Sequence, residues 1–166
     1  MSGNEGDQLS NEFSHVDDSG RIRMVDVSDK ASTRRSATAS CVIVTTADVS
    51  TRSTPSDDLD MVHSARLAGI LASKQTAQLI PLCHPLNLDD IQVDVVATAR
   101  GAEIRSSVTT VHQTGVEMEA LTACAVAALS LLTSLEALGE RARMDELVLE
   151  RKSGGRSGDW GRATLT

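Results

Sequence analysis

The chain has 166 residues with a formal net charge of −7, and it contains one Phe, one Trp and no Tyr. This length fits one domain with a sizeable core, while the lack of aromatic side chains and of a basic stripe excludes most modes of nucleic-acid binding. We find neither a run of 18 uncharged apolar residues nor a signal peptide, and therefore expect a cytoplasmic protein that does not associate with a membrane. The three cysteines lie far apart in sequence, which predicts neither a metal site nor disulfide bonds.

Residues 1–22 are predicted to form a disordered acidic tail. The first 20 residues include five acidic residues and neither Lys nor Arg. They also lack periodic apolar positions, so burial cannot offset the entropy of ordering them. We therefore place one folded domain at residues 23–160 and a flexible C-terminus at residues 161–166.

Apolar periodicity predicts two helices and a set of strands along the domain. In chain order we expect a short strand at residues 24–27, a strand at 36–46, a helix at 61–79, strands at 91–97 and 103–111 joined by a hairpin at 99–102, a helix at 114–138 and a strand at 145–150. The order of the longer elements, strand, helix, strand, strand, helix, strand, is that of ferredoxin-like folds. The predicted class is α+β, with an antiparallel sheet covered on one face by two helices. A thin aliphatic core also favours oligomerisation.

One histidine near the centre of the chain lies between two prolines. The segment Leu-Ile-Pro-Leu-Cys-His-Pro-Leu occupies residues 79–86. Pro81 and Pro85 fix their own φ and restrict the residue before each, which predicts a rigid extended connection that aims His84. An imidazole held there could exchange a proton or bind a phosphate near neutral pH. The alternative is a core histidine that is satisfied by a backbone carbonyl.

Two glutamates occur at the start of the long apolar helix. Thr114 and Glu117 have the spacing of a capping box, which alone could explain Glu117. Glu119 precedes an Ala-rich run and should face protein on most sides. Buried acids with perturbed pKa values are typical of general acid and base sites, although structural networks produce them too.

The segment Lys-Ser-Gly-Gly-Arg-Ser-Gly at residues 152–158 follows the last predicted strand. Glycines let successive N–H groups converge on an anion, and Lys and Arg add positive charge, so the segment is a candidate phosphate cradle. The order of residues is not that of a Walker A loop. The alternative is a flexible Ser/Gly tail.

Four segments of the chain together resemble the MoaC family of cyclic pyranopterin monophosphate synthases, which act in molybdenum cofactor biosynthesis. They are residues 24–28, 79–86, 114–122 and 152–159, and they occur in the family's order. The resemblance implies a ferredoxin-like subunit, assembled as a hexamer of three dimers with active sites at the dimer interface. It also implies a reaction, in which 3′,8-cyclo-7,8-dihydroguanosine triphosphate becomes cyclic pyranopterin monophosphate and pyrophosphate is lost.

The resemblance also implies roles for individual residues around a nucleotide or pterin substrate. No resident cofactor is implied, although Mg²⁺ could accompany the triphosphate. Lys152 would neutralise the triphosphate, and Arg35 would reach a phosphate from the neighbouring subunit. The implied catalytic residues are His84, Glu117, Glu119 and Lys152, and the implied substrate-binding residues are Leu82, Cys83, His84, Met118, Glu119 and Arg35.

Three positions depart from the family pattern. The family has Lys-Gly-Asp before its first helix, where an ungapped count back from His84 finds Asp58 in place of the Lys. It has Asp-x-x-Lys on its second helix, where the count forward from Glu119 finds Thr133 and Glu136. These changes make the site more negative toward a polyanionic substrate, and electrostatic stabilisation is often the largest catalytic contribution. Three hypotheses follow. The chain is a synthase in which other groups compensate, a catalytically impaired paralogue that binds the nucleotide or assembles with an active partner, or an enzyme that catalyses a related reaction on another substrate.

Overall fold

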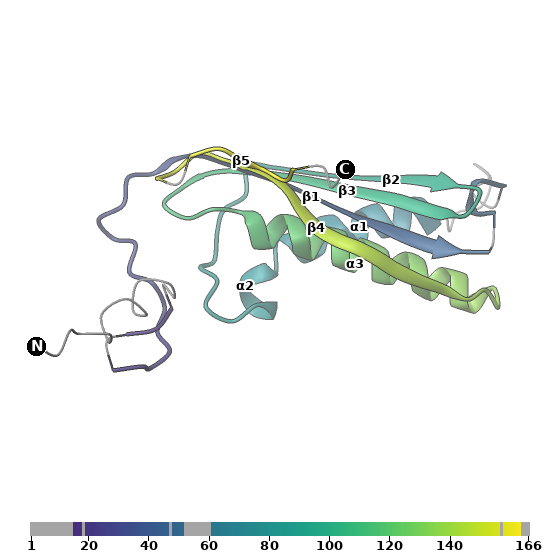
Figure 1. Cartoon of the computed structure of the whole chain (residues 1–166), viewed down its shortest axis with the longest axis horizontal. Helices are drawn as coiled ribbons and strands as arrows, with labels where there is room; N and C mark the ends of the chain where they lie inside the picture. The colour runs from purple at the N-terminus through teal and green to yellow at the C-terminus, as the bar shows by residue number, and fades with distance from the viewer. Residues whose placement is uncertain (1–14, 18, 47, 52–60, 157, 164–166) are drawn as a thin grey trace, which may run out of the picture.

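Strands and helices form two layers, with the sheet on one side and the helices on the other (Figure 1). The computed structural model describes residues 15–17, 19–46, 48–51, 61–156 and 158–163. The elements in chain order are β1 (Thr33–Thr45), the 3₁₀ helix η1 (Val49–Thr51), α1 (Met61–Ser73), α2 (Thr76–Leu79), β2 (Asp90–Thr98), β3 (Gly101–His112), α3 (Glu117–Ala137), β4 (Ala142–Ser153) and β5 (Trp160–Gly161).

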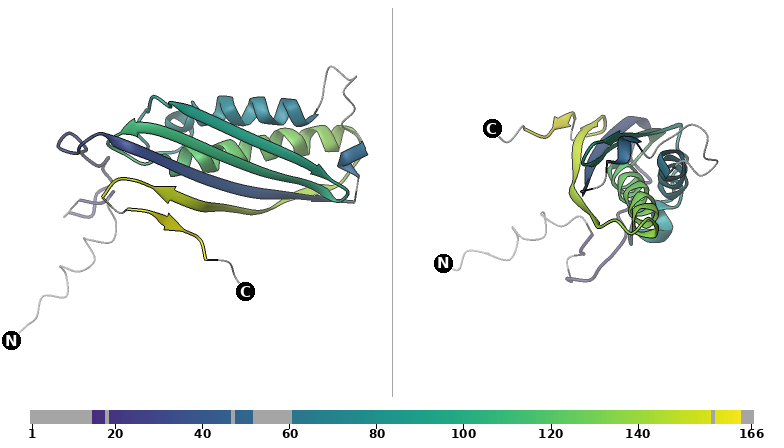
Figure 2. Two further views of the ribbon diagram at one scale, coloured as in Figure 1. Left: turned by 90° about the horizontal axis from the view of Figure 1, so that it is seen from above. Right: turned by 90° about the vertical axis from the view of Figure 1, so that its right-hand side faces the viewer.

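The five strands form one antiparallel sheet in the order β2-β3-β1-β4-β5. The long helices α1 and α3 run side by side beneath it, as the view from above shows (Figure 2). Thr98 pairs with Gly101, so Ala99 and Arg100 make the two-residue turn of the predicted hairpin. The α+β class and the order of the long elements are therefore confirmed.

The core lies between the sheet and the two long helices. Alternate residues of β1 are buried, from Ala37 through Cys41 to Ile43, because successive side chains of a strand point to opposite faces. The helices approach closely at Gly69, where a Cβ atom would lie 2.8 Å from the carbonyl oxygen of Ala123. The helix α3 is long and apolar enough to cross a membrane by length and composition, but its buried residues pack here as those of a core helix.

Two predicted elements differ markedly from the structure. Residues 24–27 form no strand, although they follow an alternating pattern. The helix expected at 61–79 ends at Ser73, and a separate turn of helix, α2, follows. There the Thr76 hydroxyl donates to the carbonyl oxygen of Ser73 at 2.9 Å, a local bond that competes with continuation of the helix.

Described residues near both ends of the chain form backbone hydrogen bonds. Within the expected tail, Val16 pairs with Ile22, and Arg23 N donates to the carbonyl oxygen of His15 at 2.9 Å. Within the expected flexible C-terminus, Gly161 belongs to β5 and Arg162 N donates to Glu150 O at 2.8 Å. These residues are held by hydrogen bonds of a turn and by pairing at the edge of the sheet, which a search for apolar periodicity does not detect. Residues 1–14 and 164–166 lie outside the described part of the chain.

Candidate active site at the start of α3

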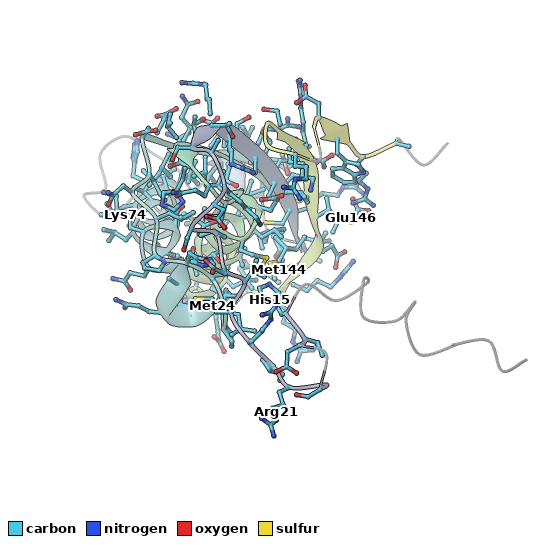
Figure 3. All side chains as sticks on the ribbon, turned by 90° about the vertical axis from the view of Figure 1, so that its left-hand side faces the viewer. His15, Arg21, Met24, Lys74, Met144 and Glu146 are labelled. Atoms are coloured by element: carbon cyan, nitrogen blue, oxygen red, sulfur yellow. The ribbon has the colours of Figure 1, made fainter. Side chains whose placement is uncertain are left out.

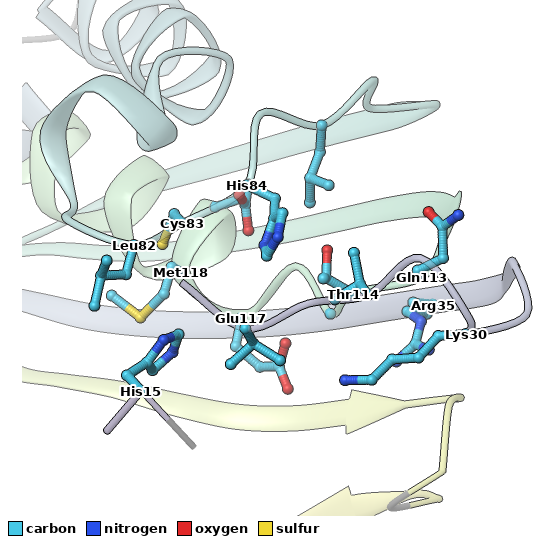
Figure 4. A pocket seen from close by; sticks show the side chains of 15 residues that line it. His15, Lys30, Arg35, Leu82, Cys83, His84, Gln113, Thr114, Glu117 and Met118 are labelled. Atoms are coloured by element: carbon cyan, nitrogen blue, oxygen red, sulfur yellow. The ribbon is translucent and has the colours of Figure 1, made fainter. Parts of the chain in front are cut away.

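A cavity of about 450 Å³ opens where the proline-bracketed segment meets the start of α3 (Figure 4). Its walls come from the N-terminal segment, β1, residues 82–86, the loop after β3 and the first turn of α3. The lining residues are His15, Val25, Val27, Lys30, Arg35, Leu82, Cys83, His84, Leu86, Gln113, Thr114, Gly115, Glu117, Met118 and Glu119. Segments that are far apart in sequence thus converge on one space.

Seven of the residues named from the sequence line this cavity: Arg35, Leu82, Cys83, His84, Glu117, Met118 and Glu119. Lys152 does not line it but contacts Glu117, which does. Asp58 lies outside the described residues. Thr133 and Glu136 are exposed on α3, 14 and 17 residues beyond Glu119, which corresponds to roughly 21 and 26 Å along a helix. Within one chain these two side chains are not brought to the cavity.

The proline-bracketed segment contains a tight turn and is not uniformly extended. Ile80 is extended, with φ −108° and ψ 116°, as expected before Pro81. Leu82, however, has a φ of +64°, and Cys83 N donates to Ile80 O at 3.4 Å. Proline followed by a residue of positive φ is the pattern of a type II turn, in which a leucine is strained by roughly 1–2 kcal/mol. The turn places Cys83 and His84 in the cavity wall. Its third position usually requires glycine, but leucine occupies it here.

The predicted capping box at the start of α3 is wrong. The residue before the first turn is Val116, no side chain caps the helix, and the buried Thr114 hydroxyl has no hydrogen-bond partner among the described residues. The Glu117 carboxylate instead contacts the Lys152 ammonium, with 3.3 Å between Oε1 and Nζ. Glu117 therefore pairs with a cation from β4 instead of capping the helix, and it lies on the cavity wall.

Glu119 is the buried acid of the cavity, with a side chain 4 % exposed. Burial is the main cause that raises its pKa to about 7, the charge of Glu117 raises it further, and a backbone hydrogen bond opposes the shift. A carboxyl group with this pKa is present in both protonation states near neutral pH. Beside His84, it gives the cavity a second group able to donate or accept a proton.

Cys83 lies next to this acid on the cavity wall. Burial, and to a lesser degree the charge of Glu119, raises the pKa of its thiol. The thiol form therefore predominates at neutral pH, and Cys83 provides a neutral, polarizable contact in place of an anionic nucleophile.

The opposite end of the cavity is basic. Lys30 and Arg35 lie there, and a second cavity of about 610 Å³ shares both residues and adds Arg156. Arg35 Nε donates to the carbonyl oxygen of His112 at 2.9 Å, which fixes the guanidinium at this end. Gly155, with a φ of +75°, leaves no room for a Cβ atom beside that guanidinium. The Gly/Ser segment after β4 is therefore packed against Arg35.

Sequence reasoning assigned no site role to the other eight residues on the cavity wall: His15, Val25, Val27, Lys30, Leu86, Gln113, Thr114 and Gly115. Val25 and Val27 lie in the segment expected to be a strand, and Lys30 comes three residues after its end. The signal available for His15 was the turn-forming series from Asp17 to Gly20, which brings the chain back toward the domain.

Comparison with known proteins decides the family. The model of the MoaC family matches residues 24–155. The chain belongs to the MoaC family. It is 46% identical over 155 residues to the cyclic pyranopterin monophosphate synthase of a Nocardioides species, which covers 90% of this chain and 95% of that protein.

Other members of the MoaC family show similar sequence identity to this chain over similar lengths. Cyclic pyranopterin monophosphate synthase 2 of Mycobacterium tuberculosis is 43% identical over 160 residues, or 94% of this chain and 95% of that protein. The synthase of a Nostoc species is 44% identical over 154 residues, or 89% of this chain and 90% of that protein. The resemblance inferred from four sequence segments is confirmed, and by similarity the chain is a synthase-like protein of molybdenum cofactor biosynthesis.

Proposed function

We propose that this chain converts 3′,8-cyclo-7,8-dihydroguanosine triphosphate into cyclic pyranopterin monophosphate with release of pyrophosphate. The proposal rests on its membership of the MoaC family together with one observation: a single cavity holds proton-exchanging groups between an apolar end and a basic end. That order matches a substrate with a heterocycle at one end and a triphosphate at the other.

The basic end would hold the triphosphate. Arg35 presents a planar guanidinium already fixed by His112, and Lys30 adds a second cation. Charge-assisted hydrogen bonds to phosphate are among the stronger ones in proteins. Lys152 offsets the negative charge of Glu117, which would otherwise repel the phosphates.

The acids and His84 would carry the proton transfers. Ring rearrangement and loss of pyrophosphate both require protons to move, and a group works best when its pKa lies near the working pH. Glu119, with a pKa of about 7, meets that condition. We assign it to proton exchange with the substrate, and His84 to the same task or to a phosphate contact.

Magnesium would enter with the triphosphate. Within the described part of the chain, no group of three His, Cys, Asp or Glu side chains is placed to hold a metal ion. The phosphate oxygens are themselves the hard ligands that Mg²⁺ prefers.

We further propose a cytoplasmic homo-oligomer, a hexamer of three dimers. Leu67, Leu71 and Leu129 on the outer faces of α1 and α3 are each more than half exposed, although solvent-facing leucines gain nothing in a monomer. Thr133 and Glu136 also lie too far from the cavity of their own chain to act there. They could meet a cavity only in a neighbouring subunit.

A second candidate is a catalytically impaired paralogue that binds the nucleotide or assembles with an active partner. Thr133 and Glu136, together with Asp58, favour it, because the resemblance expects Asp, Lys and Lys at these positions. Replacing two cations with acids weakens attraction to a triphosphate wherever the subunits meet.

Restoring the family residues separates the two candidates. The triple variant Asp58→Lys, Thr133→Asp, Glu136→Lys and the wild type would be compared for pyrophosphate release from the cyclised substrate, and for its binding by calorimetry. The synthase assignment predicts slow turnover by the wild type and at least a tenfold increase in the triple variant. Tight binding with no turnover by either protein would support the binding paralogue. Neither binding nor turnover would overturn both assignments.

A further inference from the structure

The N-terminal segment before residue 24 contributes a side chain to the cavity, although it precedes the residues that the MoaC family model matches. Figure 4 shows His15 at the end of the cavity that holds Leu82 and Met118, with its ring directed toward Met118 and Glu117. Lys30 and Arg35 lie at the other end. The imidazole therefore belongs to the apolar end, where a heterocycle would bind.

A compact turn holds His15 in place. The Asp17 carboxylate accepts hydrogen bonds from Ser19 N and Arg21 N, each at 2.9 Å, and from the Ser19 hydroxyl at 2.6 Å. The backbone adds bonds from Asp17 N to Arg21 O and from Arg23 N to His15 O, both at 2.9 Å. Figure 3 shows the result, with Arg21 at the tip and away from the domain and His15 at the base and against it. The position of His15 thus depends on backbone and Asp17 contacts, and not on the imidazole itself.

Among the described residues of the cavity wall, histidines are the only side chains with a ring that could stack against the heterocycle of a ligand. Flat heterocycles bind well against the face of another ring, and the chain has no Tyr and only one Phe and one Trp. The one Trp, Trp160, lies on the edge strand β5 and does not line the cavity. Among the residues that line it, only His15 and His84 carry a ring.

We propose that His15 is a further substrate-binding residue, whose imidazole covers the heterocycle of the nucleotide at the Leu82 and Met118 end of the cavity. This inference rests on the proposed function, because it takes a cyclised guanosine triphosphate as the ligand. His15 then discriminates a nucleotide from a bare polyphosphate, which the basic end alone would hold.

Two ligands and three substitutions test the role of His15. Calorimetry would measure binding of GTP and of inorganic tripolyphosphate to the full chain and to His15→Ala, His15→Phe and His15→Gln. We expect His15→Ala and His15→Gln to weaken GTP binding about tenfold and to leave tripolyphosphate binding within twofold of wild type. His15→Phe, which keeps a ring face, should bind GTP within about twofold of wild type.

A fourth variant tests the turn that holds the ring. Asp17→Ala removes three hydrogen bonds of the turn and should weaken GTP binding in the same selective way. Asp48→Ala is the matched control, because Asp48 makes the same kind of turn with Ser50 N and the Ser50 hydroxyl beyond the far end of β1. It should bind both ligands as the wild type does.

Several results would overturn the inference. One is a His15→Ala variant that binds GTP as tightly as the wild type, and another is a variant that loses equal affinity for GTP and for tripolyphosphate. A third is wild-type affinity for GTP in His15→Gln but not in His15→Phe. The last is a wild type that binds no GTP. Because this experiment measures binding, absence of pyrophosphate release would count against the proposed synthase reaction and leave the His15 result to stand by itself.

Discussion

The Lys152 ammonium lies 3.3 Å from the Glu117 carboxylate and joins β4 to the first turn of α3 beside the cavity. Both side chains are 30% exposed, and such pairs contribute at most about 1 kcal/mol to stability. The pair occupies the place where a local helix cap was expected. Its importance should therefore lie in the charge it brings to the site.

Removal of Lys152 should harm binding more than folding. We expect Lys152→Gln to raise the Kd for tripolyphosphate about tenfold, because Glu117 would then face the phosphates unpaired, and to lower the free energy of unfolding by less than about 1 kcal/mol. Calorimetry and urea denaturation measure the two effects. Arg143→Gln is the control, since it breaks an exposed pair with Asp145 on the same strand that does not line the cavity. If both variants weakened tripolyphosphate binding equally, Lys152 would have no specific role in the charge of the site.

The stability of the chain should depend on the protonation of Glu119. Its pKa in the folded chain is about 7, above the ordinary value of 4.5, so the native state keeps a proton that the unfolded chain releases in this range. The stabilisation is complete below about pH 4.5 and is lost as the pH rises through 7. At about 1.4 kcal/mol per pKa unit, wild type should lose roughly 2–3 kcal/mol relative to Glu119→Gln between pH 5 and pH 8. Urea denaturation at a fixed protein concentration measures both free energies of unfolding. A difference between wild type and Glu119→Gln that stays constant from pH 5 to pH 8 would refute the account.

Gly155 should be required for anion binding because of its neighbour. In Gly155→Ala the new Cβ atom would meet the Arg35 guanidinium and displace it, and the positive φ of +75° adds backbone strain. Gly139→Ala provides the same strain, at φ +78°, with nothing within 4 Å of the new atom. Both variants should lose about 1 kcal/mol of stability. Only Gly155→Ala should weaken tripolyphosphate binding, by about tenfold, and a loss of the same size in Gly139→Ala would show that strain alone is responsible.

One thiol of the native chain should react with a disulfide reagent. Cys41 and Cys124 are buried, whereas Cys83 is partly exposed on the cavity wall. We expect Ellman's reagent to count one thiol in the native protein and three in urea, with a rate that rises with pH because the pKa of Cys83 is raised. GTP should slow the reaction. Cys83→Ser should leave no reactive thiol in the native chain, and a residual count of one would place the reactive group elsewhere.

Local patterns predicted the sheet, the long helices and the glutamates of the site, because alternation and helical period report directly on which side chains are buried. They failed where a distant contact replaced a local one. Glu117 pairs with Lys152, 35 positions away, and the spacing to Thr114 cannot reveal this. The left-handed Leu82 and the return of His15 to the cavity likewise depend on tertiary context.

The most direct test of the site is single-turnover release of pyrophosphate, with the wild-type chain in excess over 3′,8-cyclo-7,8-dihydroguanosine triphosphate. We predict one pyrophosphate and one cyclic pyranopterin monophosphate for each substrate consumed, and a rate at least a hundredfold lower in Glu119→Gln, since a positioned acid or base contributes about 10²–10⁴-fold. No product from the folded wild type over a long incubation, or the same rate in Glu119→Gln, would contradict the assignment.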